Sequence, residues 1–92
     1  MSEPIVDNTA QQRYELAADG AIAYVAYSRE PGTITLIHTI VPDALAGRGI
    51  GSRLAKFVLD DARSHGEKVI VQCSFIAAYL RKHPEYADLV SA

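Results

Sequence analysis

Residues 33–65 read TITLIHTIVPDALAGRGIGSRLAKFVLDDARSH, and the order of the patterns in this stretch decides the fold. Its first nine residues, 33–41, are rich in Thr, Ile and Val, which predicts a β-strand. Beyond the glycines, the apolar residues recur with a helical period. This apolar stripe consists of Ile50, Leu54, Phe57, Val58 and Ala62. The stretch therefore predicts a strand, a glycine-rich turn and a helix over 52–65, with Gly66 as a C-cap.

Shorter patterns on both sides of this stretch complete the expected fold. An Asp-Gly pair at 19–20 and a Pro-Gly pair at 31–32 predict tight turns between strands. A second helix should begin with Ser74 as its N-cap. The expected strands span 12–16, 21–28, 33–41 and 68–72, and the expected helices span 52–65 and 74–82. This order, β-β-β-α-β-α, predicts an α+β fold with helices packed on a mostly antiparallel sheet.

Length and composition restrict the classes of function. The chain has 92 residues, which suit a single domain with one core and one site. We expect residues 1–10 and 87–92 to be loosely ordered tails. The net charge of −2 argues against nucleic-acid binding, and the apolar runs are too short to span a membrane. The single cysteine excludes a Cys-cluster metal site, so we expect no metal and a soluble, cytoplasmic protein.

The glycine-rich turn is the most informative motif. Gly47, Gly49 and Gly51 alternate with larger residues just before the predicted helix. Such a turn can direct backbone N–H groups into one concavity, and the helix N-terminus adds positive potential. The pattern favours a phosphate or diphosphate, with Arg48 and Arg53 as additional charges. The alternative is a flexible loop that only helps the helix to start.

The same turn resembles a known loop. Ala46-Gly47-Arg48-Gly49-Ile50-Gly51, after a strand and Val41-Pro42, is similar to the acetyl-CoA loop of the GNAT superfamily of N-acetyltransferases. That loop has the form Arg/Gln-x-x-Gly-x-Gly/Ala, and Ala46 stands where the family prefers Arg or Gln. His38-Thr39, Cys73 and the motif Tyr79-Leu80-x-x-His83-Pro84-Glu85-Tyr86 extend the resemblance to the small single-domain YjdJ-type branch of the superfamily.

The resemblance implies a minimal GNAT-like fold that uses acetyl-CoA as co-substrate. The pantetheine arm is expected to pair with the strand before the loop, and the diphosphate with N–H groups of the loop. A backbone N–H near Ile40 would polarise the acetyl carbonyl. The expected coenzyme contacts are Thr39, Ile40, Val41, Gly47, Arg48, Gly49, Ile50, Gly51 and Ser52. The acceptor is expected to be a primary amine: a protein lysine, a polyamine or a small amine.

Three residues are candidates for catalysis. His38 is the only titratable residue on an apolar strand face, shared with Ile34 and Leu36, and histidine is suited to be a general base. Cys73 lies between a strand and a helix N-terminus and could be a nucleophile or line the acetyl pocket. Tyr79 corresponds, by resemblance, to the tyrosine that serves many GNAT enzymes as general acid. Each also has a purely structural interpretation, as a core histidine, a buried thiol or a packing tyrosine.

Two functions from different classes remain open at this point. The first is an acetyl-CoA-dependent N-acetyltransferase. The second is a module that binds CoA or acyl-CoA with little or no turnover. Only residues 17–20 separate the first two predicted strands, where most GNAT domains insert two helices, so the acceptor side is expected to be open. We expect a monomer or a weak dimer, because an edge strand can pair with another copy.

Overall fold

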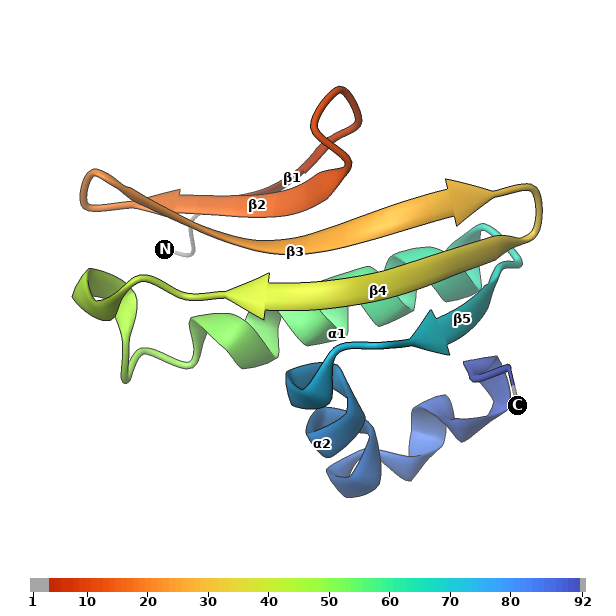
Figure 1. Ribbon diagram of the computed structural model, residues 1–92. Helices are drawn as coiled ribbons and strands as arrows, with labels where there is room; N and C mark the ends of the chain where they lie inside the picture. Colours follow the sequence, from red (N-terminus) through yellow and green to blue (C-terminus); the bar gives the residue numbers. More distant parts are fainter. Residues whose placement is uncertain (1–3, 92) are drawn as a thin grey trace.

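The strand and turn patterns of the sequence form one five-stranded sheet in the computed structural model, which describes residues 4–91. The strands are β1 (Ile5–Asn8), β2 (Arg13–Ala18), β3 (Ala21–Glu30), β4 (Thr33–Ile40) and β5 (Lys68–Val71). They lie in sequence order, with antiparallel pairing from β1 to β4 and parallel pairing of β5 with β4 (Figure 1). The predicted α+β class is confirmed, with one strand more than expected.

Helices cover one face of this sheet. They are α1 (Ile50–Ser64) and α2 (Ser74–Lys82), with the 3-10 turns η1 (Asp43–Leu45) and η2 (Pro84–Leu89). The stripe of α1 packs on the sheet, where Leu54, Val58 and Ala62 are fully buried. No helix of the described chain covers the opposite face, on which Ile22 and Ile40 are exposed (Figure 1). We call the two sides the covered face and the uncovered face.

Strand β1 corrects the expectation that residues 1–10 form a loosely ordered tail. Ile5–Asn8 pairs with β2, so β1 and not β2 is the edge of the sheet. Asp7 accepts hydrogen bonds from Tyr27 at 2.5 Å and from Arg29 at 3.3 Å. The strand has only four residues, too few for a clear alternation of apolar and polar side chains, although its partner strand β2 lies only 5 to 11 residues away. Residues 1–3 and 92 lie outside the described part of the chain.

The C-terminal segment is also ordered where a tail was expected. Tyr86 and Leu89 of η2 are buried, and the Tyr86 hydroxyl donates to Asp60 at 2.6 Å. Val90 forms a parallel bridge with Val69, whose carbonyl accepts the Ser91 N–H at 2.9 Å. These contacts attach residues 87–91 to α1 and to the outer edge of β5.

A β-bulge changes the orientation of the second half of β4. Ala26 lies opposite His38, but Tyr27 lies opposite Leu36, so Ile37 is an extra residue in the ladder. An extra residue reverses the alternation of side chains between the two faces. Leu36 is therefore buried, whereas His38 is exposed on the uncovered face. The prediction that His38 shares a face with Ile34 and Leu36 is wrong, because the bulge leaves no trace in the alternating sequence.

Candidate functional site

The glycine loop has the backbone conformation that its sequence predicts. Gly47 has a φ of 80° and Gly49 a φ of 72°, in the left-handed region that glycine adopts at little cost. Gly49 is the N-cap of α1, and the Arg53 N–H donates to the Gly49 carbonyl at 3.1 Å. The N–H groups of residues 50–52 precede this bond and have no acceptor within the helix. No side chain caps them, and the first turn holds no acidic residue.

A cavity of about 310 Å³ lies at this loop. Six of the expected coenzyme contacts line it: Val41, Gly47, Gly49, Ile50, Gly51 and Ser52. Thr39, Ile40 and Arg48 are not among its lining residues. The Arg48 guanidinium instead pairs with Asp19 at 2.5 Å, across the turn between β2 and β3.

Phe75 completes the wall of the cavity and was not anticipated from the sequence. It stands in the first turn of α2, and a Cβ atom on Gly51 would lie 2.8 Å from its ring. The backbone of Gly51 is helical, so its small size and not its conformation is what lets the Phe75 ring lie this close to α1. In the sequence, the match of Gly51 to the family loop indicated that a small residue is needed at this position. It did not reveal that the ring of Phe75 lies against Gly51.

Strands β4 and β5 separate next to this cavity. Their pairing ends at Leu36, whose carbonyl accepts the N–H groups of both Gln72 (2.9 Å) and Cys73 (3.1 Å). Beyond this point β4 continues to Ile40, paired with β3 alone. Residues 37–40 therefore have an open backbone edge that faces away from β3. The Thr39 hydroxyl and the Cys73 sulfur approach each other to 3.3 Å in this gap.

The three catalytic candidates are not brought into one cluster. Cys73 is 5% exposed and is the N-cap of α2, a position predicted for Ser74. Thr39 lies opposite Val25 on the covered face, whereas the neighbouring His38 is on the uncovered face beside Tyr24 (ring centroids 6.1 Å apart). His38 and Cys73 thus flank the gap from opposite sides of the sheet.

Tyr79 lies on the far side of Phe75 from the glycine loop. Its ring stacks on His83, with 3.9 Å between the centroids. It lines a smaller cavity of about 140 Å³, and Ser52 and Phe75 belong to both this cavity and the one at the loop. Burial raises the pKa of Tyr79 above its ordinary value of 10.0, and a phenol with either pKa is protonated at neutral pH.

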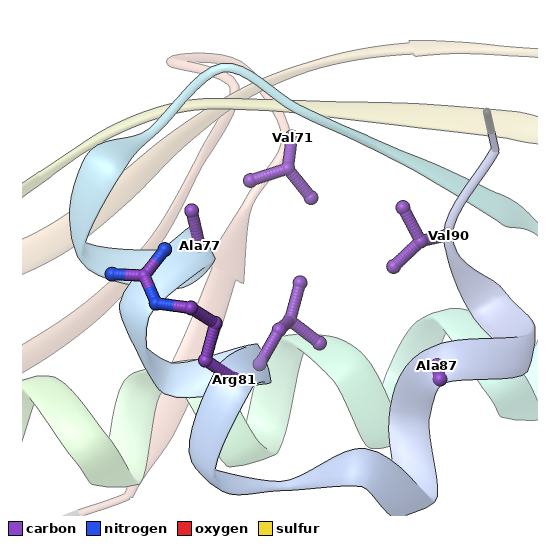
Figure 2. Close-up of a pocket in the computed structure, with 6 residues that line it drawn as sticks. Val71, Ala77, Arg81, Ala87 and Val90 are labelled. Atoms are coloured by element: carbon purple, nitrogen blue, oxygen red, sulfur yellow. The ribbon is translucent and has the colours of Figure 1, made fainter.

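A second cavity lies on another face of α2, away from the glycine loop (Figure 2). It has a volume of about 340 Å³, and its walls come from β5, α2 and the C-terminal segment. None of its lining residues is shared with the cavity at the loop.

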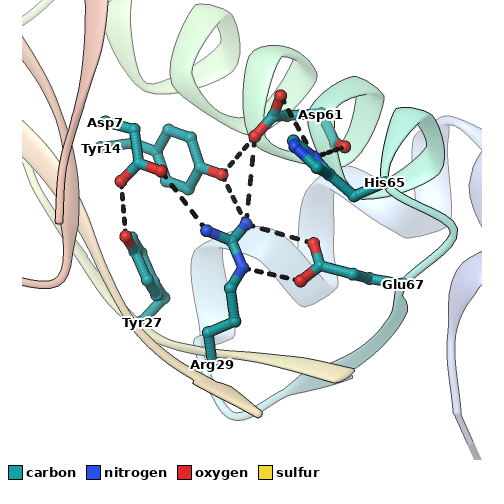
Figure 3. Close-up of polar contacts among 7 residues, drawn as sticks. All are labelled: Asp7, Tyr14, Tyr27, Arg29, Asp61, His65 and Glu67. Carbon is teal, nitrogen blue, oxygen red and sulfur yellow. Dashed lines mark hydrogen bonds and ion pairs between the residues drawn. The ribbon is translucent and has the colours of Figure 1, made fainter. Parts of the chain in front are cut away.

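A polar cluster lies at the end of α1 opposite the glycine loop, centred on Arg29 (Figure 3). We call it the Arg29 cluster; its other members are Asp7, Tyr14, Tyr27, Asp61, His65 and Glu67. Arg29 donates to both oxygens of Glu67, at 2.6 and 3.1 Å, and to the hydroxyl of Tyr14 at 2.8 Å. Burial and a hydrogen bond to Asp7 raise the pKa of Tyr27 to about 12.

Two other features are absent from residues 4–91. These residues hold no group of three or more His, Cys, Asp or Glu side chains placed to bind a metal ion. No helix among them is both long and apolar enough to cross a membrane.

Fold and loop together define the class of this protein. A strand, a glycine loop and a helix follow one another in the GNAT pattern, on a sheet whose last two strands separate beside the loop. Comparison with family models makes the class specific. Residues 13–89 match the model of the GCN5-related N-acetyl-transferases, and the chain belongs to this family. The resemblance to the GNAT superfamily is confirmed.

Individual relatives agree with this assignment. The chain is 40% identical over 52 residues to protein NATD1 of Xenopus tropicalis, and 41% identical over 51 residues to human NATD1. These matches include 56% and 55% of this chain, but only 48% and 45% of the relatives. The chain thus spans about half the length of these curated relatives.

A solved structure resembles the whole described fold. The solution NMR structure of a GCN5-like candidate N-acetyltransferase from Staphylococcus aureus has a TM-score of 0.75 and 31% sequence identity to this chain. The similarity includes 100% of this chain and 92% of the other. The fold of this chain is thus similar to the fold of that protein over nearly the whole length of both chains.

Proposed function

We propose that the chain is an acetyl-CoA-dependent N-acetyltransferase that acetylates a primary amine. One observation carries the proposal: the cavity at the glycine loop lies directly beyond the open edge of β4. Val41 lines the cavity and immediately follows Ile40, the last residue of β4. A ligand with a diphosphate and an extended amide arm could therefore meet backbone groups along its length. Acetyl-CoA, when bound, supplies an acetyl group activated as a thioester.

The residues of the loop fit a diphosphate. Positive φ angles at Gly47 and Gly49 turn the backbone around the cavity, and the free N–H groups of residues 50–52 point out of the start of α1. No carboxylate of the first helical turn opposes an anion there. Ala46 lacks the side-chain contact that Arg or Gln provides in the family pattern, so the backbone carries most of this binding.

Transfer requires that protons move at two atoms. The neutral amine attacks the acetyl carbon, its nitrogen loses a proton as the amide forms, and the sulfur gains a proton when its bond to that carbon breaks. His38 is exposed on the uncovered face and could accept the first proton from an amine that arrives there. Tyr79 keeps its phenolic proton at neutral pH and could donate the second.

Cys73 leaves a covalent alternative open. Its sulfur lies in the gap between β4 and β5, within 3.3 Å of the Thr39 hydroxyl. It could take the acetyl group onto its own sulfur before the amine attacks, or it could only line the acetyl pocket. Both routes use the same loop and the same open strand edge.

The acceptor would approach from the uncovered face. That face carries His38, and no described helix shields it (Figure 1). An open face suits a protein lysine, a polyamine or another small amine. Cytoplasmic location and a monomeric or weakly dimeric state remain predictions from the sequence.

A module that binds CoA or acyl-CoA without efficient turnover is the second candidate. The separation of His38 and Cys73 on opposite sides of the sheet favours it, because the catalytic groups do not form one cluster. Both candidates require that the loop binds the coenzyme. Isothermal titration with acetyl-CoA and CoA tests this requirement, and absence of binding at millimolar ligand would exclude both.

Turnover separates the two candidates. The test uses a panel of amines that includes lysine-containing peptides, polyamines and small amines. We expect mass spectrometry to detect acetylation of at least one of them. His38→Ala should lower kcat by about 10²-fold or more, because a general base is lost. His65→Ala, a second exposed histidine near the far end of α1, is the control and should keep full activity. Equal activities of the two variants would refute the base assignment.

Cys73→Ala distinguishes the two chemical routes. A loss of more than about 10²-fold in kcat, together with an acetylated Cys73 in the intact protein, would support the covalent route. Full activity of Cys73→Ala would leave direct attack as the mechanism. Acetyl-CoA affinity of each variant, measured by titration, separates effects on chemistry from effects on binding.

A further inference from the structure

The second cavity is formed by a face of α2 that the proposed coenzyme site does not use. Ala77, Leu80 and Arg81 follow helical spacing and line this cavity of about 340 Å³. Phe75 instead lines the cavity at the glycine loop, and Phe75 and Tyr79 both line the smaller cavity next to it. Helix α2 thus separates two sites that could be occupied independently.

The walls of the second cavity are almost entirely aliphatic. Val71 from β5 and Val90 from the C-terminal segment line it opposite α2, and two alanines, Ala77 and Ala87, leave its sides unfilled, so that the cavity is widely open to solvent (Figure 2). Small-molecule sites have this character: mostly apolar walls, volumes from about 300 Å³, and few polar groups. An apolar group that enters would be removed from water together with these side chains.

Arg81 is the one charged residue in the lining. Within residues 4–91, its guanidinium has no hydrogen bond and no ion pair. The acidic residues of the adjoining segment do not pair with Arg81: the Glu85 carboxylate lies 3.6 Å from the His83 ring, and Asp88 pairs with Arg63 at 3.0 Å. A guanidinium presents a planar pair of donors that matches a carboxylate.

From these observations we infer that the second cavity binds a small aliphatic monocarboxylate, with its chain among the valines and alanines and its carboxylate on Arg81. The lining offers one charged group and no other ionisable side chain, so the ligand has one anionic end and an otherwise apolar body. A chain of about four to eight carbons suits a cavity near the lower limit of ligand sites. This site is independent of the proposed acetyl transfer.

Methyl NMR of the full chain with three probes tests the proposal. Sodium hexanoate should bind with a dissociation constant of about 1 mM and shift the methyl signals of Val71, Leu80 and Val90. Hexan-1-ol has the same chain without charge, and sodium acetate has the charge without the chain, so each should bind at least about 10-fold more weakly. Absence of hexanoate binding at 20-fold this concentration, roughly 20 mM, would overturn the proposal. So would equal binding of hexan-1-ol, or shifts confined to the glycine loop.

Substitutions locate the binding. Arg81→Gln should weaken hexanoate binding about 10-fold, whereas Arg81→Lys should retain most of it. Lys82→Gln removes a neighbouring charge that faces another side of α2, and it should leave the hexanoate affinity unchanged. Ala77→Leu should fill the cavity and abolish binding; unchanged hexanoate affinity in Ala77→Leu or Arg81→Gln would refute the site.

Folding and coenzyme binding are followed in the same variants. Thermal unfolding reports whether Ala77→Leu still folds, and Arg81→Gln, an exposed change, provides the second test if it does not. Acetyl-CoA titration of Arg81→Gln should match that of the original chain. A chain that binds hexanoate but no acetyl-CoA would refute only the proposed function, and the reverse result only this site.

Discussion

Gly49 meets two requirements at one backbone position. Its φ of 72° lies where residues with a side chain are strained, and it is the N-cap from which α1 starts. An Ala side chain at this position would meet no atom within 4 Å, so the space around it is open to a ligand. Substitution of Gly49 therefore tests whether the glycine loop binds phosphate. A control substitution at another glycine with positive φ separates this effect from the cost in backbone strain.

We predict that Gly49→Asp raises the dissociation constant for acetyl-CoA by at least about 10²-fold. A carboxylate would then lie at the positive end of α1, where its negative charge would repel the negatively charged diphosphate. Gly32→Asp is the matched control, because Gly32 has a similar φ of 77° in the turn at the other end of β4. Both variants should lose about 1–2 kcal/mol of stability from strain. Equal acetyl-CoA affinities in titration would contradict the prediction.

At the scale of elements, the Arg29 cluster connects strands that are not neighbours in the sheet, and it attaches them to the end of α1. It joins Asp7 of β1 to Arg29 of β3, and through Glu67 and Asp61 it attaches both to the end of α1 and the start of β5. The Glu67 side chain is only 8% exposed. Its ion-pair partner is Arg29, and removal of that partner is costly because the carboxylate is buried.

We predict that Arg29→Met lowers the free energy of unfolding by about 2–3 kcal/mol. This loss is smaller than the loss expected when a fully buried ion pair is broken, because the Arg29 side chain retains some contact with water. Arg63→Met is the control: it breaks an ion pair with Asp88 in which both side chains are well exposed, and it should change stability little. Urea unfolding at neutral pH measures both. The prediction fails if the two substitutions cost the same.

At the scale of the whole molecule, the cluster predicts how stability depends on alkaline pH. The pKa of Tyr27 is raised from 10.0 to about 12, first by burial and then by its bond to Asp7. Folding thus favours the protonated phenol. This contribution is complete below pH 10 and is lost as the pH rises through about 12, because the unfolded chain releases the proton first.

The free energy of unfolding should therefore fall between pH 10 and pH 12, and it should fall less steeply in Tyr27→Phe. Urea unfolding at pH 8 and at pH 11 provides the measurement, with Tyr24→Phe on the uncovered face as the comparison. Burial raises the pKa of Tyr14 as well, so Tyr27→Phe retains part of the slope. If the free energy of unfolding falls equally between pH 8 and pH 11 in the original chain and in Tyr27→Phe, Tyr27 has the same pKa in the folded and unfolded states and the prediction is wrong.

Local patterns were sufficient for the part of the fold that carries the loop. The helix over 74–82 has the predicted ends, and the strand, glycine turn and helix follow in the predicted order. Glycine spacing also indicated the residues that line one cavity, because a left-handed φ and a helix start are properties of neighbouring residues. Strand β1 was not predicted because four residues are too few for a clear alternation, and the ordered C-terminal segment was not predicted because its partners, Asp60 and Val69, lie far away in the sequence.

The sequence by itself determined the family, the α+β class and the position of the glycine loop, since periodicity and glycine spacing act over a few residues. Tertiary structure alone decided that a bulge exposes His38, that Thr39 meets Cys73 in the gap, and that Phe75 closes the wall over Gly51. It also decided which charges surround Arg29. Each of these depends on contacts between residues of different elements, from 9 residues apart at the bulge (Tyr27 and Leu36) to 38 residues apart in the Arg29–Glu67 pair, and such contacts leave no periodic signal in the chain.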